Sequence, residues 1–116
     1  MGFQKNIKIF LNSADALLMP SHREGLPMIL IEAICTGIPI IGSSVGALNY
    51  LVTDNGLLFE PRNINDISDS IRSFSSNKNN FLEIALKKAT IFQKRFHPNN
   101  WGDQTIKIYR KVLSQK

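Results

Sequence analysis

The sequence has little of several features that mark particular protein classes. It holds one cysteine, Cys35, which excludes an internal disulfide and suits a reducing cytoplasm. No apolar run reaches the roughly eighteen residues that a membrane-spanning helix needs. The segment Met1 to Ile9 alternates lysines with apolar residues and lacks the apolar stretch of a secretory signal. We therefore expect a cytoplasmic protein without a spanning helix.

Metal-binding patterns are also scarce. The sequence contains no Asp-x-Asp, and His22, Cys35 and His97 do not have the spacing of a ligand cluster. We therefore expect no metal site.

The positive charge is concentrated at one end of the chain. Residues 83–116 hold eight basic and two acidic residues, a net charge of +6, whereas the rest holds six basic and seven acidic, a net charge of −1. Such a segment can contact an anionic membrane surface peripherally, at the inner face of the membrane, or it can be a solvated face of ordinary helices. Aromatic residues do not interleave with the basic ones, so we expect no nucleic-acid partner.

The length of 116 residues admits one compact domain, and 43% hydrophobic with 20% charged residues is ordinary for a globular one. Short apolar runs closed by Pro, Gly or Asn predict strands at residues 16–19, 38–41 and 56–59. A short helix is predicted at residues 6–14, before the first strand, and a helix from Pro27 to about Thr36, ended by Gly37, between the first and second strands. From Asn65 onward the apolar spacing is helical, with a polar turn expected at residues 75–80. Strands separated by helices predict a parallel sheet.

The segment from Pro20 to Glu32, PSHREGLPMILIE, has the strongest signs of a binding site. It leaves one expected strand and enters a helix, which places it at the carboxyl edge of a parallel sheet, where ligands of such folds bind. Gly25 permits close approach to the backbone, and the free N–H groups at the helix start suit a phosphate or a sugar hydroxyl. His22 and Arg23 lie in the same loop and are either phosphate contacts or ordinary surface residues.

Glu32 is unusual because the predicted helix around it is otherwise apolar. We expect it to be buried, and a buried carboxylate requires partners. These are either backbone groups and water at the sheet edge or a ligand. Glu24 precedes it by eight residues, and two helical turns are expected to separate the two carboxylates, which would let both face one cleft at different depths. Alternatively, Glu24 is a solvated loop acid.

These segments together resemble the family 4 (group 1) GT-B-type glycosyltransferases. The similarity includes a Pro-Ser-x-x-Glu-Gly-x-Pro loop, the E-x7-E pair Glu24 and Glu32, a Glu-Ala-x-x-x-Gly-x-Pro step to Pro39 and a glycine loop at Gly46. A preceding Ser-Ala-Asp-Ala and a later Asn-Gly-Leu-Leu also match. After Gly46 the family often has Pro-Glu, whereas this chain has Asn49-Tyr50.

The resemblance implies a fold and a set of roles. It implies an α/β, partial Rossmann-like domain, the C-terminal half of a GT-B enzyme, over residues 1–116, with the acceptor domain absent. Glu24 would be the catalytic residue and, with Gly25 and Leu26, would hold the donor sugar and its phosphate. The other substrate-binding positions implied are Ser21, Pro27 and Glu32, the last for the ribose hydroxyls.

The implied reaction is retaining, metal-independent hexosyl transfer from a nucleotide sugar such as a UDP- or GDP-sugar, with no further cofactor. Since closure of two domains fixes such chemistry, we expect the fragment to be inactive alone. The alternative is a non-catalytic donor-binding subunit that pairs with a separate chain carrying the missing N-terminal acceptor domain. A receiver-like or flavodoxin-like domain is disfavoured because those folds need about five strands.

Overall fold

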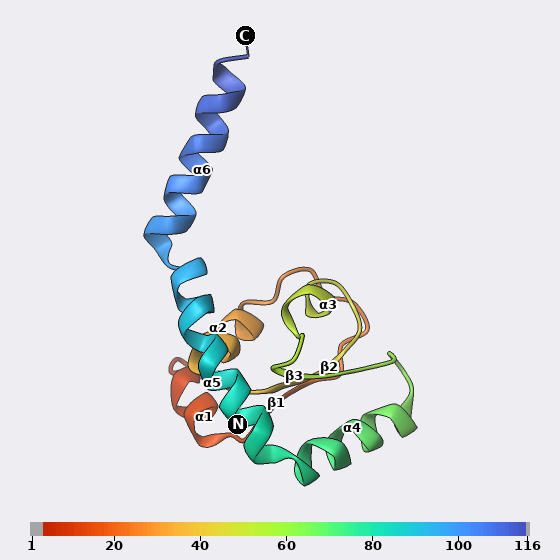
Figure 1. The fold of residues 1–116 in the computed structure, drawn as a ribbon. Helices are drawn as coiled ribbons and strands as arrows, with labels where there is room; N and C mark the ends of the chain where they lie inside the picture. The colour runs from red at the N-terminus through yellow and green to blue at the C-terminus, as the bar shows by residue number, and fades with distance from the viewer. Residues whose placement is uncertain (1–3, 116) are drawn as a thin grey trace.

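The computed structural model describes residues 4–115, which form a mixed α/β domain of three strands and six helices (Figure 1). The elements, in chain order, are α1 (Ile7–Ser13), β1 (Leu17–Met19), α2 (Met28–Thr36), β2 (Ile40–Ser43), α3 (Leu48–Leu51), β3 (Gly56–Phe59), α4 (Ile64–Ser76), α5 (Lys78–Arg95) and α6 (Pro98–Leu113).

The three strands form one parallel sheet in the order β1-β2-β3. Leu18 is in register with Ile41, and Ile41 with Leu57. The predicted α/β domain with a short parallel sheet and C-terminal helices is therefore confirmed. Within residues 4–115, the outer edge of β1 pairs with no strand, and Leu18 on that strand is 44% exposed.

Strand β2 begins two residues later than the sequence predicts, at Ile40 rather than Ile38. Gly37 ends α2 in the left-handed conformation, with φ of 83°, and its N–H donates to Ile34 at 3.1 Å. The N–H of Ile38 donates back to Ala33 at 3.1 Å, and Pro39 has no N–H to give. The two residues after Gly37 therefore complete the helix cap before the ladder starts.

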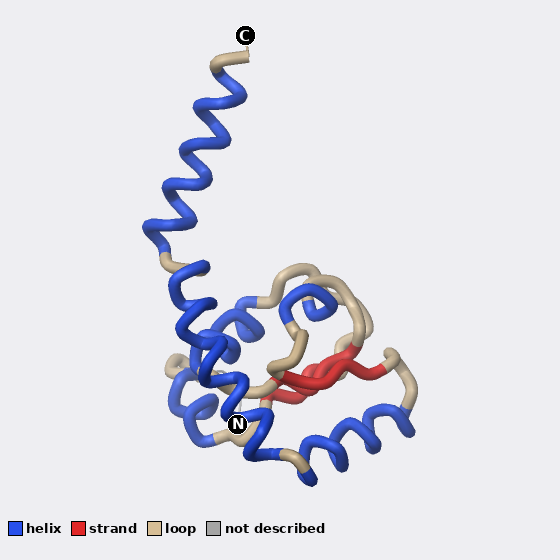
Figure 2. Tube along the Cα trace, viewed as in Figure 1, coloured by secondary structure: helices blue, strands red, loops and turns tan. Residues whose placement is uncertain are grey.

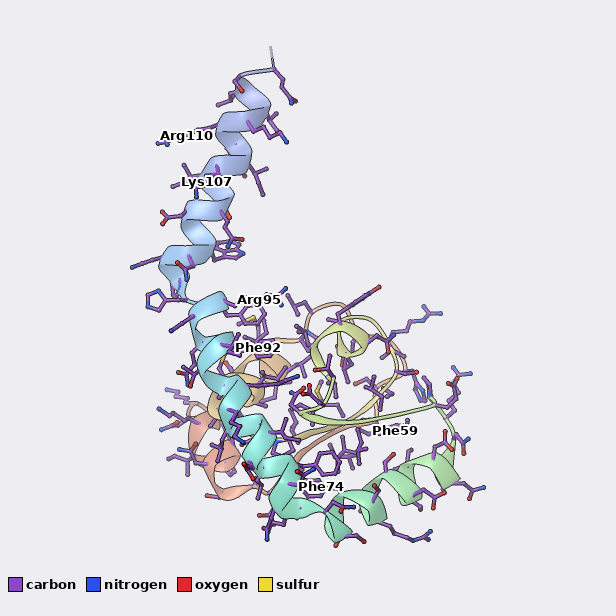
Figure 3. The ribbon with its side chains drawn as sticks, viewed as in Figure 1. Phe59, Phe74, Phe92, Arg95, Lys107 and Arg110 are labelled. Carbon is purple, nitrogen blue, oxygen red and sulfur yellow. The ribbon has the colours of Figure 1, made fainter. Side chains whose placement is uncertain are left out.

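Two apolar cores lie on opposite faces of the sheet. The larger core packs α1, α2, α3 and part of α5 on one face, with Leu30, Ile40 and Leu48 fully buried. The smaller core packs α4 on the other face, where Phe59 of β3 meets Phe74 of α4 (Figure 3). Packing on both faces explains why every residue of β2 is buried, rather than alternating between buried and exposed.

Two short features differ from the prediction. Helix α3 was not predicted, because its single turn is shorter than any periodicity can reveal. The expected polar turn at residues 75–80 is wrong: α4 runs to Ser76, α5 starts at Lys78, and Asn77 alone separates them. Asn77 donates its own N–H to Ser73 and Phe74 and accepts from Phe81, so the chain bends without unwinding further.

Helix α6 extends away from the body of the domain (Figures 1 and 2). None of its residues is buried, although one side carries the predicted apolar stripe, which includes Trp101, Ile108 and Val112. Among residues 4–115, none of the helices combines the length and the apolar character needed to cross a bilayer.

Candidate functional site

The loops that follow the three strands meet at one edge of the sheet. β1 ends at Met19, and residues 20–27 connect it to α2; β2 ends at Ser43, and a short loop leads to α3. Because the strands are parallel, their carboxyl ends lie on the same side. The structure therefore places the predicted loop, with Ser21, Glu24, Gly25 and Leu26, at the edge where ligands of such sheets bind.

Helix α2 starts at Met28, with Pro27 as the residue before its first turn. Pro27 has extended geometry, with φ of −69° and ψ of 131°, and its carbonyl accepts the N–H of Leu30 at 3.1 Å. In the described part of the chain, no side chain caps this helix start. The N–H groups of Met28 and Ile29 in the first turn are therefore available to an anion or a hydroxyl oxygen.

Glu24 lies half-buried in the loop, and its carboxylate is held by a neighbour. The Ser21 hydroxyl donates to Glu24 Oε1 at 2.6 Å. The carbonyl of Gly25, the next residue, accepts the N–H of Ala47 at 3.1 Å from the loop after β2. Glu24 therefore sits in a fixed loop rather than as a freely solvated acid. Leu26 beside it is exposed.

Glu32 is exposed, so the expectation that it is buried is wrong. Only one face of α2 is buried. Leu30, Ala33 and Ile34 form that face, whereas Glu32 lies on the exposed side of the helix. Within residues 4–115 no hydrogen bond or ion pair is formed by the Glu32 carboxylate, although its carbonyl accepts from the Thr36 hydroxyl. The carboxylate is therefore free to accept hydrogen bonds from a ligand.

A cleft of about 520 Å³ opens beside Glu32. Three helices line it, α1 with Ile7, Lys8 and Leu11, α2 with Glu32, Cys35 and Thr36, and α5 with Gln93. Glu24 is not among the lining residues. The expected two helical turns between Glu24 and Glu32 are wrong because α2 begins only at Met28.

The cleft has a mixed chemical character. Lys8 and Glu32 bring one charge of each sign, and the Gln93 side chain donates to the Cys35 carbonyl at 2.6 Å. Partial burial raises the pKa of the Cys35 thiol, so this group is a neutral thiol at neutral pH. Sequence reasoning missed Lys8 and Gln93, since only the packing of α1 and α5 against α2 brings them here.

A second cleft, of about 390 Å³, is lined by apolar residues. Its lining comes from the loop, from α2 and from the junction of α5 and α6: Leu26, Met28, Ile31, Phe96, Pro98 and Trp101. Sequence reasoning did not anticipate it, because the lining residues come from distant segments.

The remaining polar residues of the loop, His22 and Arg23, are exposed. Among residues 4–115 no group of three or more His, Cys, Asp or Glu side chains is arranged to hold a metal ion.

Comparisons with known proteins agree on one family. The family model of the glycosyl transferases of group 1 matches residues 1–97. The O-antigen chain mannosyltransferase B of Escherichia coli is 32% identical over 98 residues, which is 84% of this chain and 26% of the relative. The chain thus spans about a quarter of the length of this relative.

Solved structures share the fold at lower sequence identity. The HepE protein of Anabaena, in complex with UDP, has a TM-score of 0.87 at 21% identity, over 96% of this chain and 31% of that one. Sucrose-phosphate synthase of Thermosynechococcus elongatus has a TM-score of 0.84 at 23% identity, over 95% and 28%.

Proposed function

Because the chain belongs to the group 1 glycosyl transferases, we propose that it is the part of such an enzyme that binds the nucleotide-sugar donor. The observation that carries the proposal is the placement of two acids. Glu24 lies in a fixed loop at the carboxyl edge of the sheet, and Glu32 presents an unpaired carboxylate to a cleft one turn into α2. A relative named as a mannosyltransferase and a neighbour in complex with UDP support the donor class.

In this proposal each acid has a separate task. The cleft beside Glu32 receives the nucleoside, and the carboxylate accepts hydrogen bonds from the ribose hydroxyls. The N–H groups at the start of α2, next to Pro27, face the diphosphate. Glu24, with Ser21 and the backbone of Gly25 and Leu26, holds the hexose near the reacting carbon.

The proposed reaction is retaining hexosyl transfer without a metal ion. Charge on the departing diphosphate is then stabilised by backbone N–H groups and the helix dipole rather than by a cation. Transfer also needs a domain that binds the acceptor, so we propose that activity of this chain depends on an additional polypeptide segment. That polypeptide is either the remainder of one enzyme or, in the alternative function, a separate chain with which this one pairs as a non-catalytic donor-binding subunit.

The donor proposal is tested by thermal unfolding of the 116-residue chain with millimolar UDP- and GDP-sugars. A donor at about ten times its Kd raises the stability by about 1.4 kcal/mol, which we expect for the wild type and not for Glu32→Ala. Glu83→Ala is the matched control, because Glu83 is also an exposed helical glutamate but lies on α5 outside the cleft. If no nucleotide sugar protects the wild type, or if Glu32→Ala is protected equally, the proposed site is wrong.

The dependence on a second half is tested by adding a separately expressed acceptor domain to the purified chain. We expect transfer only when both are present. Transfer with a complete, separately encoded partner supports the subunit alternative. Transfer by this chain alone contradicts the expected inactivity.

We also propose a cytoplasmic location with peripheral contact to the inner face of the membrane through the basic C-terminal helices. Helix α6 carries Lys107 and Arg110, which Figure 3 labels, and Lys111, with Asp103 as its one acid. Its apolar residues are exposed as well, so the helix offers both cations and apolar side chains to a membrane surface. Each cation near an anionic surface contributes about 1 kcal/mol. We expect the chain to sediment with vesicles of phosphatidylglycerol but not with vesicles of phosphatidylcholine. If it binds neither kind of vesicle, or both equally, this part of the proposal is wrong.

A further inference from the structure

Ser43 is a fully buried serine at the end of β2. It lies next to the loop of residues 20–27, which we call the donor loop. Its hydroxyl donates to the backbone carbonyl of Ser21 at 2.5 Å and lies 3.3 Å from the carbonyl of Met19. A hydroxyl has one proton to donate, so the shorter contact is the stronger hydrogen bond. This bond joins β2, the central strand of the sheet, to Ser21, the second residue of the donor loop.

Ser21 links Ser43 to Glu24 through two hydrogen bonds. Its backbone carbonyl accepts from Ser43, while its own hydroxyl donates to Glu24 Oε1 at 2.6 Å. The direction of that hydroxyl depends on where the Ser21 backbone is held. The orientation of the Glu24 carboxylate is therefore linked through two hydrogen bonds to a buried group in the sheet.

The loop after β2 holds the other end of the donor loop. Gly46 has a left-handed φ of 49°, and a Cβ added there would lie 1.9 Å from the Glu24 carbonyl oxygen. The next residue, Ala47, donates its N–H to the Gly25 carbonyl at 3.1 Å. The two loops are thus in backbone contact at Glu24 and Gly25.

We propose that Ser43 is a positioning residue for Glu24 and acts through Ser21. With no exposed surface, Ser43 does not touch a donor; it fixes the loop that does. The inference rests on the proposed function, in which Glu24 holds the donor sugar. It adds a residue outside the E-x7-E motif and the Pro20–Glu32 segment to the residues that determine donor binding.

The test uses Ser43→Ala and Ser21→Ala, with Ser44→Ala as the control. Ser44 is the adjacent serine; its backbone N–H donates to the Phe59 carbonyl, and its hydroxyl has no hydrogen-bond partner among residues 4–115. The first measurement needs no ligand and is amide hydrogen exchange at Ala47. Because the loop loses its link to the sheet, we expect Ser43→Ala to speed this exchange about tenfold. Ser21→Ala keeps the backbone carbonyl, so it and Ser44→Ala should exchange at the wild-type rate.

The second measurement is donor affinity, from thermal shift against donor concentration. We expect Ser43→Ala and Ser21→Ala each to weaken the affinity about tenfold, with Ser44→Ala unchanged. In a Glu24→Ala background Ser43→Ala should weaken it no further, because both act through one carboxylate. A purely structural role would predict additive effects. If Ser43→Ala does not fold, the same measurements are made with Ser43→Cys, which keeps the size of the side chain but is a weaker donor to the Ser21 carbonyl.

The outcomes separate the two proposals. The positioning role is wrong if the Ala47 amide of Ser43→Ala exchanges at the wild-type rate. It is also wrong if Ser43→Ala and Glu24→Ala weaken donor affinity additively. Either result leaves the proposed donor site in place. Absence of any donor protection in the wild type overturns the proposed function, and the exchange measurement then still decides whether Ser43 holds the loop.

Discussion

Replacing Gly46 with alanine should separate the stability of the domain from its donor binding. Gly46 has a φ of 49°, in the left-handed region that alanine enters at a cost of about 1–2 kcal/mol. The new Cβ would also lie 1.9 Å from the carbonyl oxygen of Glu24, a backbone atom that cannot rotate away. The only relief is for the two loops to move apart.

Movement of the loops has a second cost. It breaks the hydrogen bond from the Ala47 N–H to the Gly25 carbonyl, which contributes about 1 kcal/mol. We therefore expect Gly46→Ala to lose about 2–3 kcal/mol in total, a fall in Tm of roughly 10 °C for a domain of this size.

Gly37→Ala is the matched control for this prediction. Gly37 also has a positive φ, 83°, and its added Cβ would meet the flexible end of Leu86 at 2.8 Å and the Leu86 Cα at 3.3 Å. Its loss of stability should be similar, about 2 kcal/mol, but it lies at the far end of α2 from the donor loop.

The assay is the same for both variants, calorimetric Tm with and without a protecting nucleotide sugar. We expect both to melt early, Gly37→Ala to keep its ligand-induced shift and Gly46→Ala to lose it. Full protection of Gly46→Ala by the donor would contradict this prediction, because it would mean that the contact between the loops does not shape the site.

Three further outcomes follow from the packing and the chemistry. Leu30→Ala, at a position with no exposed surface in the larger core, should lose about 3–4 kcal/mol in urea unfolding; a loss below 1 kcal/mol would contradict the packing of α2 on the sheet. Asn63→Ala removes the side-chain acceptor of the Asp66 N–H at the start of α4 and should cost about 1 kcal/mol by the same method. The pKa of the Cys35 thiol is raised by burial, so at pH 8 it should react with a disulfide reagent more slowly in the native chain than in urea, and equal rates would exclude this shift.

The elements with local signals were predicted well from the sequence. Gly37 ends α2 as its position before Ile38 and Pro39 indicates, and β3 has the predicted bounds because Gly56 and Pro61 delimit it. The start of β2 was misplaced since the helix cap consumes Ile38, a tertiary detail that apolar content does not encode.

The candidate site was predicted in part. The loop and the helix start lie where the motif places them, and Ser21 meets Glu24 as two residues of one loop. The burial of Glu32 was wrong because a nine-residue helix on a three-stranded sheet keeps one side open even when most of its residues are apolar. Ser43 was not identified, although a serine that ends an apolar strand was a usable signal.

The outer edge of β1 has a consequence for how the domain would be assembled. A parallel strand added there would deliver its own following loop next to Ser21, because carboxyl ends of parallel strands meet at one edge. The polypeptide that extends the sheet would thereby also supply a wall of the donor pocket. Association of the added strand and binding of the donor would then be linked equilibria. A bound nucleotide sugar would strengthen the association of that strand beside Leu18 by the same factor by which the association strengthens nucleotide-sugar binding.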